Sequence, residues 1–433
     1  MARIGVIGGG IAGMGAAWAL DARHDVVLYE AEARIGGHSN TVDVEDEGRV
    51  VPVDTGFIVY NERNYPNLVR LFDSLEVPTE WSDMSFSVSV GAGAFEYQSR
   101  AGGLLAQPSN LLRPGTWRML RDFRRFCRDA PRVLSSGTRE SLGSYLERGG
   151  YSDEFRLDLL LPVSAAIWSS GLDDMLEFPV TTLVGFLASH DILQVRARPR
   201  WRTVSGGSRE YVRRLTAGYR DRIRLSSPVV AVRRDEDGVE LLDASGGLDR
   251  FDEVVFATHP DTTLRILGPE ATLRERHVLG SVRYQDNEAV LHRDAALMPR
   301  RRAVWSSWNY LADGRGEPDR TKPVSLTYWM NRLQNLPTER PVFVTLNPIR
   351  EPRGEVQRFR YAHPQFDRAA IDAQRSLPAI QGTRRTWFAG AWCGHGFHED
   401  GLRAGLDVAA ALGAPAPWGV MPRPPALVGE IAA

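Results

Sequence analysis

Lysine is nearly absent from this sequence of 433 residues: Lys322 is the only one, although lysine and arginine together number 53. Aspartate and glutamate number 54, so the formal net charge is -1. Proteins that coat nucleic acid usually carry a clear basic excess, so this balance argues against a nucleic-acid partner. Cysteine is also scarce. Cys127 and Cys393 are too few for a disulfide framework or a zinc site, which indicates a reducing compartment, and we expect no metal site.

Long apolar runs are missing as well. The most apolar internal run, Leu157–Trp168, contains Asp158 and Pro162 and falls short of the ~20 residues that a membrane span needs. The N-terminal apolar stretch holds too many glycines for a signal peptide. We therefore expect a cytoplasmic protein. Its length suits two or three domains, with the proline-rich residues 414–433 as a C-terminal tail.

The N-terminus has the pattern of a βαβ unit that binds a dinucleotide. Arg3–Ile7 is predicted as a strand, residues 11–20 as a helix of small residues, and residues 25–30 as a second strand. Glu30 ends the second strand, where its carboxylate would accept a hydrogen bond from a ribose hydroxyl. An acid at this position favours NAD or FAD over NADP.

The glycines between these elements have separate tasks. Gly8 permits the tight turn after the first strand, and Gly10 lets the backbone approach a pyrophosphate. Gly13 lets the helix pack closely against the strand. The helix N-terminus, at Ile11 and Ala12, then offers unpaired amide groups to the phosphates.

Residues 30–37 resemble the second fingerprint of the flavin amine oxidoreductase superfamily, which includes amine oxidases, protoporphyrinogen oxidases and carotenoid desaturases. The resemblance implies FAD as the cofactor, with a diglycine passing close beneath its pyrophosphate. Members usually have arginine directly after the diglycine; this chain has His38, which implies a changed phosphate contact. The implied FAD-binding residues of this part are Ala31, Arg34, Gly36, Gly37, His38, Gly56 and Phe57.

Two later segments complete the resemblance. Residues 228–232 and 251–257 resemble the return of the chain to the FAD domain, and residues 387–391 and 399–405 resemble the strand and helix that hold the flavin. Members normally carry an acid where Ala391 stands, which implies a weaker ribityl contact. The implied contacts are Val229 to the adenine, Ala257, Gly390 and Ala391 beside the cofactor, and Gly401 and Leu402 at the flavin pyrimidine edge.

The predicted fold is α/β, with a Rossmann-like FAD-binding domain and a discontinuous substrate domain. The FAD-binding domain is expected to comprise residues 1–70, 203–264 and 380–413, and the substrate domain residues 71–202 and 265–379. Alternating apolar patterns within residues 85–90, 323–329 and 341–346 predict an antiparallel sheet in the substrate domain. Residues 151–170 are predicted to be largely helical.

His398 and Glu399 are the candidate catalytic residues. In amine oxidases an aromatic residue of the substrate cage stands where His398 falls, so the resemblance implies an imidazole facing substrate. With a pKa near neutrality it would take a proton while flavin N5 takes a hydride. The alternative is that His395 and His398 only hydrogen-bond their loop. Aligning the strand after residue 282 places Asn287 near the position of the amine oxidases' lysine, which argues against an ordinary amine oxidase.

Residues 112–132 carry seven arginines against two aspartates, with apolar residues at helical spacing. Such a basic amphipathic helix can lie on an anionic membrane surface, here the cytoplasmic face. The alternative is a solvated helix that packs one face on the core. The sequence leaves both open.

Residues 54–61, 201–208, 284–287, 308–310 and 396–401 resemble a subgroup, the bacterial FAD proteins of cyclopropane and methyl-branched fatty-acid synthesis. The methylated fatty-acid desaturases of furan fatty-acid biosynthesis are the nearest proposal. The resemblance implies a lipid acyl substrate, in a phospholipid, that is dehydrogenated to a diene. A flavin oxidase of an amine or other small hydrophobic substrate, and a non-catalytic FAD-binding accessory, remain the alternatives. The oligomeric state is left open.

Overall fold

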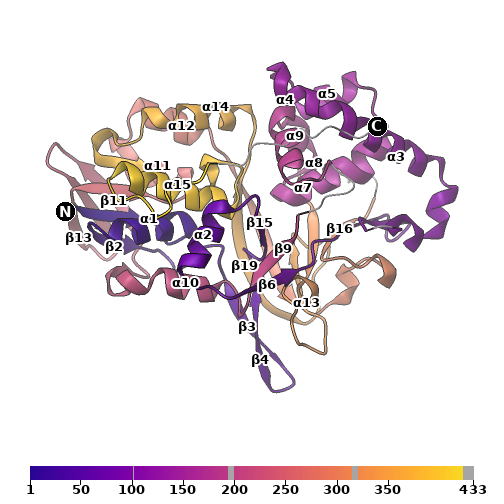
Figure 1. The fold of residues 1–433 in the computed structure, drawn as a ribbon, viewed down its shortest axis with the longest axis horizontal. Coiled ribbons are helices and arrows are strands. Elements are labelled where there is room, and N and C mark those ends of the chain that lie inside the picture. The colour runs from indigo at the N-terminus through magenta and orange to yellow at the C-terminus, as the bar shows by residue number, and fades with distance from the viewer. Residues whose placement is uncertain (101, 194–198, 315–319, 423–433) are drawn as a thin grey trace.

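A five-stranded parallel sheet forms the first of two bodies in the computed structural model, which describes residues 1–100, 102–193, 199–314 and 320–422 (Figure 1). All four neighbouring pairs are parallel, and the central strand is buried on both sides as its Ile and Val content predicts. Strands come from all three segments expected to form the FAD-binding domain. In sheet order they are β10 (Ile223–Arg224), β2 (Asp25–Tyr29), β1 (Arg3–Ile7), β14 (Glu253–Phe256) and β20 (Thr386–Phe388).

Two layers cover this sheet. One face packs against helices rich in small and apolar residues: α1 (Ile11–Asp21), α2 (Pro66–Ser74), α10 (Arg209–Leu215) and α15 (His398–Ala411). The other face packs against a small antiparallel sheet and further helices: β11 (Val229–Arg234), β12 (Val239–Asp243), β13 (Leu248–Phe251), α11 (Pro260–Leu267), α12 (Leu273–Gly280) and α14 (Arg368–Ser376). The predicted Rossmann-like core is confirmed.

A seven-stranded sheet forms the second body. The three predicted strands are present as β7, β17 and β18, and the sheet is antiparallel as predicted except between β7 and β16, which run parallel. In sheet order the strands are β19 (Glu355–Pro364), β15 (Tyr284–His292), β18 (Phe343–Leu346), β17 (Ser325–Trp329), β16 (Trp308–Ala312), β7 (Phe86–Val90) and β8 (Phe95–Gln98).

Shorter strands connect the two bodies. β3 and β4 form a hairpin, and β9 pairs with both β5 and β6. The short helix α13 follows β17 directly. Their bounds are β3 (Thr41–Asp46), β4 (Arg49–Asp54), β5 (Tyr60–Asn61), β6 (Thr79–Ser82), β9 (Trp201–Val204) and α13 (Met330–Leu333).

Helices cover the second sheet and enclose the largest apolar cluster with it. The predicted helical character of residues 151–170 is confirmed, with a π-helical turn at Arg156–Leu160. The basic helix expected over 112–132 is α3, which begins later and ends earlier and buries Met119 and Phe126. The helices are α3 (Pro114–Asp129), α4 (Val133–Ser136), α5 (Leu142–Arg148), α6 (Asp153–Phe155), α7 (Leu161–Trp168), α8 (Leu172–Glu177) and α9 (Val180–Ser189).

The predicted segment boundaries need two corrections. The boundary at residue 70 falls inside α2. The expected tail is packed over its first part, since Ala414 and Ala416 are buried and Trp418 stacks on Trp18 with ring centroids 5.6 Å apart. Its last residues, 423–433, lie outside the described part of the chain. No helix within the described ranges is both long and apolar enough to cross a bilayer.

Candidate active site

One continuous cavity of about 1370 Å³ runs between the two bodies. At one end it meets the glycine turn Gly8–Gly10 and the N-terminus of α1. At the other end it is lined by α3 and α7 and by the turn at Gly102–Leu105. The first end is rich in backbone amides and the second is apolar, so the cavity joins two chemically different environments.

The turn that follows β1 requires glycine at two positions. Gly8 has a φ of +107°, and a Cβ there would lie 2.7 Å from the Ala257 carbonyl oxygen. A Cβ on Gly13 would lie 1.9 Å from the Gly8 carbonyl oxygen, so α1 packs against its own turn at backbone distance. Gly10 precedes α1, and a Cβ there would meet nothing within 4 Å. The first amides of α1 are therefore next to open space.

A second glycine turn closes on the first. Gly37 has a φ of +56°, and a Cβ added to it would lie 3.2 Å from the Gly10 Cα. Gly36 has a φ of +122°, and a Cβ added to it would lie 2.6 Å from the Ser39 carbonyl oxygen. Arg34 donates to the Gly37 carbonyl oxygen at 2.9 Å and so fixes this turn. The two turns form a narrow cradle of backbone.

Glu30 lines this end of the cavity. Its carboxylate accepts hydrogen bonds from the Gly9 amide at 2.8 Å and the Glu32 amide at 2.9 Å. These bonds orient the side chain at the end of β2. Each carboxylate oxygen keeps a lone pair with which it can accept a ligand hydroxyl.

His398 lies in the middle of the cavity wall. Its ring stacks on Phe57, with centroids 3.8 Å apart and an interplanar angle of 9°. The His398 Nε2 atom lies 2.7 Å from the Tyr211 hydroxyl and 3.3 Å from Ser39 Oγ. Burial lowers the pKa of His398 to about 3, so the expectation of a pKa near neutrality is wrong. The imidazole is neutral at pH 7 and hydrogen-bonded to a tyrosine.

Glu399 points away from the cavity, which corrects its expected catalytic role. Its carboxylate accepts the backbone amides of Asn67 and Leu68, each at 3.0 Å, and the Asn67 side-chain amide at 2.6 Å. Burial raises the pKa of Glu399 to about 7. The residue joins the start of α15 to the first turn of α2.

Asn287 is not on the cavity wall either. It is buried in β15, donates to the Gln285 carbonyl oxygen at 3.0 Å, and accepts from the Asn347 side-chain amide at 2.7 Å. Its Nδ2 atom lies 3.3 Å from Nδ1 of His363, which does line the cavity. The expected place of Asn287 beside a flavin thus stays a prediction, and the residue of this pair that reaches the cavity is His363.

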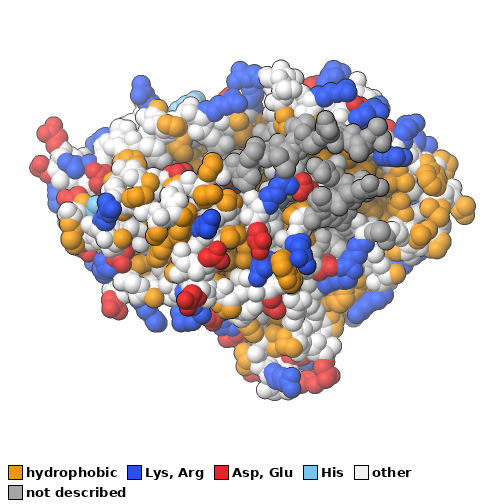
Figure 2. Space-filling view, in the orientation of Figure 1, with side chains coloured by type: hydrophobic (Ala, Val, Ile, Leu, Met, Phe, Trp, Pro, Cys, Tyr) orange, Lys and Arg blue, Asp and Glu red, His pale blue; other side chains and the backbone are white. Residues whose placement is uncertain are grey.

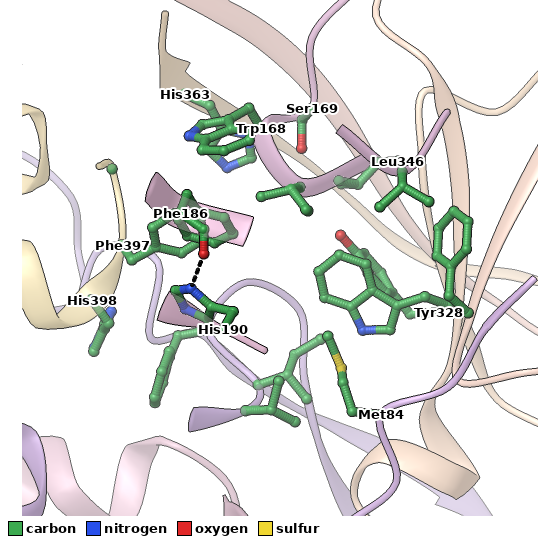
Figure 3. A pocket seen from close by; sticks show the side chains of 18 of the residues that line it. Met84, Trp168, Ser169, Phe186, His190, Tyr328, Leu346, His363, Phe397 and His398 are labelled. Atoms are coloured by element: carbon green, nitrogen blue, oxygen red, sulfur yellow. Dashed lines mark hydrogen bonds between the residues drawn. The ribbon is translucent and has the colours of Figure 1, made fainter. Parts of the chain in front are cut away.

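The far part of the cavity is an aromatic and aliphatic channel (Figure 3). Phe186 is central to it, with ring centroids 4.7 Å from Trp168, 4.9 Å from Phe397 and 3.9 Å from His190. His190 Nδ1 lies 3.0 Å from the Phe186 carbonyl oxygen, and burial lowers the pKa of this imidazole to about 4. Beyond them, Met84, Tyr328 and Leu346 continue the apolar wall.

Sequence reasoning did not find this channel. Trp168, Phe186 and His190 stand in helical segments that carry no motif. One signal was available: Leu157–Trp168 is apolar on every side, which indicates a helix that contacts the interior all round. What that helix encloses becomes visible only when β7, β17 and β18 are placed beside it.

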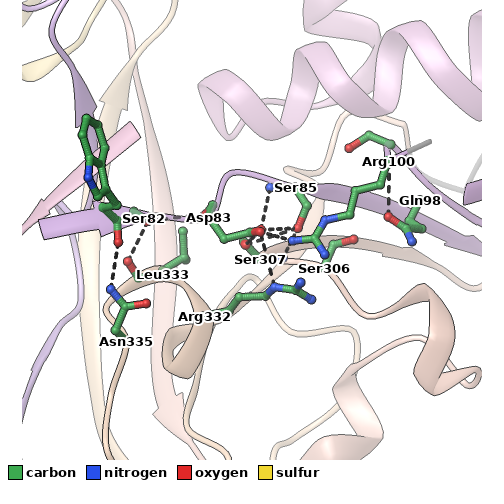
Figure 4. A network of polar contacts seen from close by, with 12 residues as sticks. Ser82, Asp83, Ser85, Gln98, Arg100, Ser306, Ser307, Arg332, Leu333 and Asn335 are labelled. Carbon is green, nitrogen blue, oxygen red and sulfur yellow. Dashed lines mark hydrogen bonds and ion pairs between the residues drawn. The ribbon is translucent and has the colours of Figure 1, made fainter. Parts of the chain in front are cut away.

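A polar group stands on the wall where the cavity passes β7 (Figure 4). The Asp83 carboxylate accepts from Ser85 Oγ and Ser307 Oγ at 2.5 Å each, and it is paired with both Arg100 and Arg332. Burial, with repulsion from Arg332, lowers the pKa of Arg100. Two guanidinium groups on one carboxylate leave this wall positively charged.

Residues 11–283 match the family of flavin containing amine oxidoreductases. The chain belongs to that family. Its cofactor is FAD, and it is an FAD-dependent oxidoreductase by family. A search of curated proteins gives no significant match.

Several solved structures share the fold. Cyclohexylamine oxidase from Brevibacterium oxydans IH-35A superposes with a TM-score of 0.67 at 18% identity, covering 95% of this chain and 98% of that one. Putrescine oxidase bound to putrescine gives 0.68 at 16% identity, with 95% and 99% covered. A CLA-producing fatty acid isomerase from P. acnes gives 0.65 at 14% identity, with 95% and 98% covered. Identities this low show the fold alone.

The residues expected to bind FAD in this flavin amine oxidoreductase fall into those that line the cavity and those that do not. The second group lies behind the wall. Gly13, Arg34 and Gly36 shape the two turns from behind, and a Cβ on Gly401 would be 3.0 Å from Ile11. The group that lines the cavity comprises Gly8, Gly10, Ile11, Ala12, Glu30, Ala31, Gly37, His38, Gly56, Phe57, Ala257, Gly390 and Ala391.

Two of the expected contacts are not made by side chains at the cavity. Val229, the first residue of β11, is buried in an apolar cluster and does not line the cavity, so its adenine contact stays a prediction. Leu402 is fully buried, and its side chain packs over Gly15 of α1. Both residues support the cofactor site from outside it.

Two unpaired polar atoms on the wall test whether the site suits FAD. His38 Nε2 and Trp392 Nε1 are buried and have no hydrogen-bond partner among the described residues. Burial holds the pKa of His38 well below its usual range, so the ring is neutral and can donate or accept. Buried polar atoms require a hydrogen-bond partner, and FAD carries many acceptor atoms that can pair with them. Together with the glycine cradle, the residues present fit the cofactor.

Proposed function

We propose that this flavin amine oxidoreductase is a desaturase of a methyl-branched, unsaturated fatty acyl chain carried by a phospholipid. The product would be a diene that serves as a precursor of furan fatty acids. The observation that carries the proposal is the apolar channel, which continues without interruption from the FAD end of the cavity to α3. Its length and lining suit a long hydrocarbon chain better than a small polar substrate.

The channel's charged groups support an uncharged substrate. Asp83 is paired with two arginines, and Asp191 is paired with Arg63. An ammonium substrate would gain most from an uncommitted carboxylate near the aromatic residues. Among the described lining residues, the other carboxylates, Glu30 and Glu32, stand at the dinucleotide end.

The chain's own residues would hold and shield the acyl chain. FAD, when bound, supplies a two-electron acceptor for a hydride. Phe186, Trp168 and Phe397 would exclude water around the reacting carbons and limit their orientation. His398 lines the cavity as a neutral ring hydrogen-bonded to Tyr211, and with a pKa of about 3 it would orient the chain while the displaced proton passes to solvent. A C–H bond beside an alkene is weakened, so the step requires positioning more than strong base.

Two other functions remain as alternatives to the desaturase, and one experiment distinguishes all three. An oxidase of an amine or another small hydrophobic substrate is favoured by the aromatic residues beside His398. A non-catalytic FAD-binding accessory is the third possibility. The FAD-loaded protein is mixed anaerobically with a methylated unsaturated phospholipid, dispersed in detergent, and the flavin absorbance is followed.

We expect the lipid to bleach the flavin and a diene to appear in the extracted acyl chains. A saturated straight-chain phospholipid of equal length is the matched control and should leave the spectrum unchanged. Cyclohexylamine and putrescine are tested in parallel, with hydrogen peroxide measured in air. Bleaching by an amine alone would identify an amine oxidase, and a spectrum that no compound changes would overturn the proposed activity.

A further inference from the structure

The open end of the apolar channel is surrounded by exposed hydrophobic side chains. The short 3₁₀ helices η1 (Gly103–Ala106) and η2 (Pro108–Leu112) precede α3. On them and on the first turn of α3, Leu112 is 86% exposed, Leu105 57% and Trp117 55%, and Leu111 is also exposed. We call Leu105, Leu111, Leu112 and Trp117 the apolar rim. Figure 2 shows hydrophobic side chains gathered at this edge of the molecule.

The apolar rim is continuous with the channel. Leu105 and Leu111 line the large cavity together with Met119 and Phe123 of α3. Leu111 also borders a shallow surface groove of about 460 Å³ that contains Leu112 and Trp117. The Trp117 indole donates to the Leu111 carbonyl oxygen at 2.9 Å, which fixes the rim's shape. A hydrocarbon chain could thus pass from the outer surface to the channel without leaving apolar contact.

Positive charge accompanies the apolar rim. No acidic residue occurs between Glu96 and Asp122, whereas this stretch contains Arg100, Arg113, Arg118 and Arg121. Arg118 is paired with Glu154 at 2.6 Å, and Arg121, although its side chain is largely exposed, lies 3.4 Å from Asp122. Among the described residues, Arg113 donates only to the Ala94 carbonyl oxygen. The protein as a whole has a net charge of -1, so the basic character is local.

We propose that the apolar rim inserts into the surface of an anionic phospholipid bilayer and admits the acyl substrate directly from the membrane. This inference rests on the proposed function, because a lipid-borne chain is what the rim would deliver. Exposed apolar side chains edged by arginine match the boundary between acyl chains and anionic head groups. Arg100, which lines the cavity beside Leu104 and Leu105, would meet a lipid phosphate that follows its chain. Of the candidate membrane segment 112–132 the rim uses only Leu112 and Trp117, and it adds Leu105 and Leu111 from the turns before that segment.

Vesicle binding tests the docking. FAD-loaded protein is sedimented with vesicles of phosphatidylcholine mixed with phosphatidylglycerol, and with phosphatidylcholine alone. We expect binding to the mixed vesicles that weakens as salt is raised. Leu112→Asp should weaken vesicle binding about tenfold or more, because a leucine that the bilayer would bury is exchanged for a carboxylate near anionic head groups. Leu273→Asp is the matched control: Leu273 is also 86% exposed, at the start of α12, and this variant should bind normally.

A second measurement separates docking from the proposed activity. Flavin reduction is compared for a substrate lipid embedded in vesicles and for its short-chain free acid in solution. Leu112→Asp should slow only the vesicle reaction. If both substrates reduce the flavin but the protein does not bind vesicles, the docking is overturned and the proposed activity stands. If the protein binds vesicles but neither substrate reduces the flavin, the proposed activity is overturned and the docking stands. A dimer that Leu112→Asp converts to monomer by light scattering, without vesicle binding, would show that the rim joins two copies of the chain.

Discussion

Two adjacent residues, His398 and Glu399, end in different surroundings because they begin a helix. Successive side chains at a helix start point about 100° apart. One imidazole therefore stacks on Phe57 in the cavity, while the neighbouring carboxylate reaches the amides of α2. The first turn of α2 has amides without intrahelical acceptors, and Glu399 satisfies two of them. Its role is to join two helices.

Replacing Glu399 by alanine tests this role. Glu399→Ala leaves the Asn67 and Leu68 amides buried without an acceptor, which should lower the free energy of unfolding by about 1–3 kcal/mol. Thermal unfolding of the FAD-loaded protein measures the loss. Glu399→Gln keeps one acceptor oxygen and should lose less. Because the carboxylate does not face the cavity, substrate-dependent flavin reduction per bound FAD should persist in both. A large loss of reduction rate in an otherwise stable, FAD-loaded Glu399→Gln would restore the catalytic interpretation.

Among the elements, the crossing of α1 and α15 determines the geometry of the cofactor end. A Cβ on Gly405 would lie 2.2 Å from the Ala12 carbonyl oxygen, so the two helices touch through backbone. Leu402 fills the space over Gly15 at the same crossing. Ile11 and Ala12 at the start of α1 line the FAD site, so any change in helix separation moves them. Small residues here set the distance between the two helices.

Gly405→Ala should therefore separate the helices. Overpacking of this kind costs about 1–3 kcal/mol of stability, and FAD retention should fall as well. Gly185→Ala, in α9, is the matched control, because a Cβ there meets only the Leu134 side chain at 3.6 Å. That variant should be neutral or stabilising by about 0.5–1 kcal/mol, since alanine favours a helix over glycine. Denaturant unfolding and the flavin-to-protein absorbance ratio measure both effects. Equal stabilities for the two variants would contradict the backbone contact.

At the scale of the whole molecule, buried neutral histidines link stability to pH. Burial lowers the pKa of His190, His292 and His363 to about 4, and that of His398 to about 3. Below pH 6.5 the unfolded chain therefore takes up protons that the folded chain does not. Two carboxyl groups act in the opposite sense: burial raises the pKa of Asp54 to about 6 and that of Glu399 to about 7. Burial also lowers the pKa of His38 and His259 and raises that of Asp407, so six groups against three leave a net uptake by the unfolded state.

The free energy of unfolding should accordingly fall as the pH is lowered from 6.5 to 5. A net uptake of about two to three protons corresponds to about 3–4 kcal/mol per pH unit. Denaturant unfolding in a fixed excess of FAD measures it. His292→Asn removes one such histidine far from the cavity and should reduce the slope by about one proton. Stability that is constant or rises toward pH 5 would contradict this balance.

The cofactor end could be predicted from the sequence because its contacts are made by backbone. Gly8, Gly13 and Gly37 are required by close approaches within a short stretch of chain, so their spacing alone carries the information. The channel could not be predicted, because Trp168, Phe186 and Tyr328 come together only through packing of distant elements. Glu399 was misassigned since proximity in sequence does not fix side-chain direction. Asn287 lies inside β15 and does not line the cavity, whereas His363 on the adjacent strand β19 does, and an alignment of sequence alone does not tell which of two paired strands supplies the wall.

The strand order of the parallel sheet also has a consequence for synthesis on the ribosome. β1 emerges first but lies between β2 and β14, and the helix that covers it with α1 is α15, near the other end of the chain. At translation rates of about 5–20 residues per second, the interval between α1 and α15 is roughly 20 to 80 s. During that time the apolar surface of β1 and α1 lacks its cover. The FAD site, to which Gly390 and Ala391 contribute, is therefore completed only when almost the whole chain has been made.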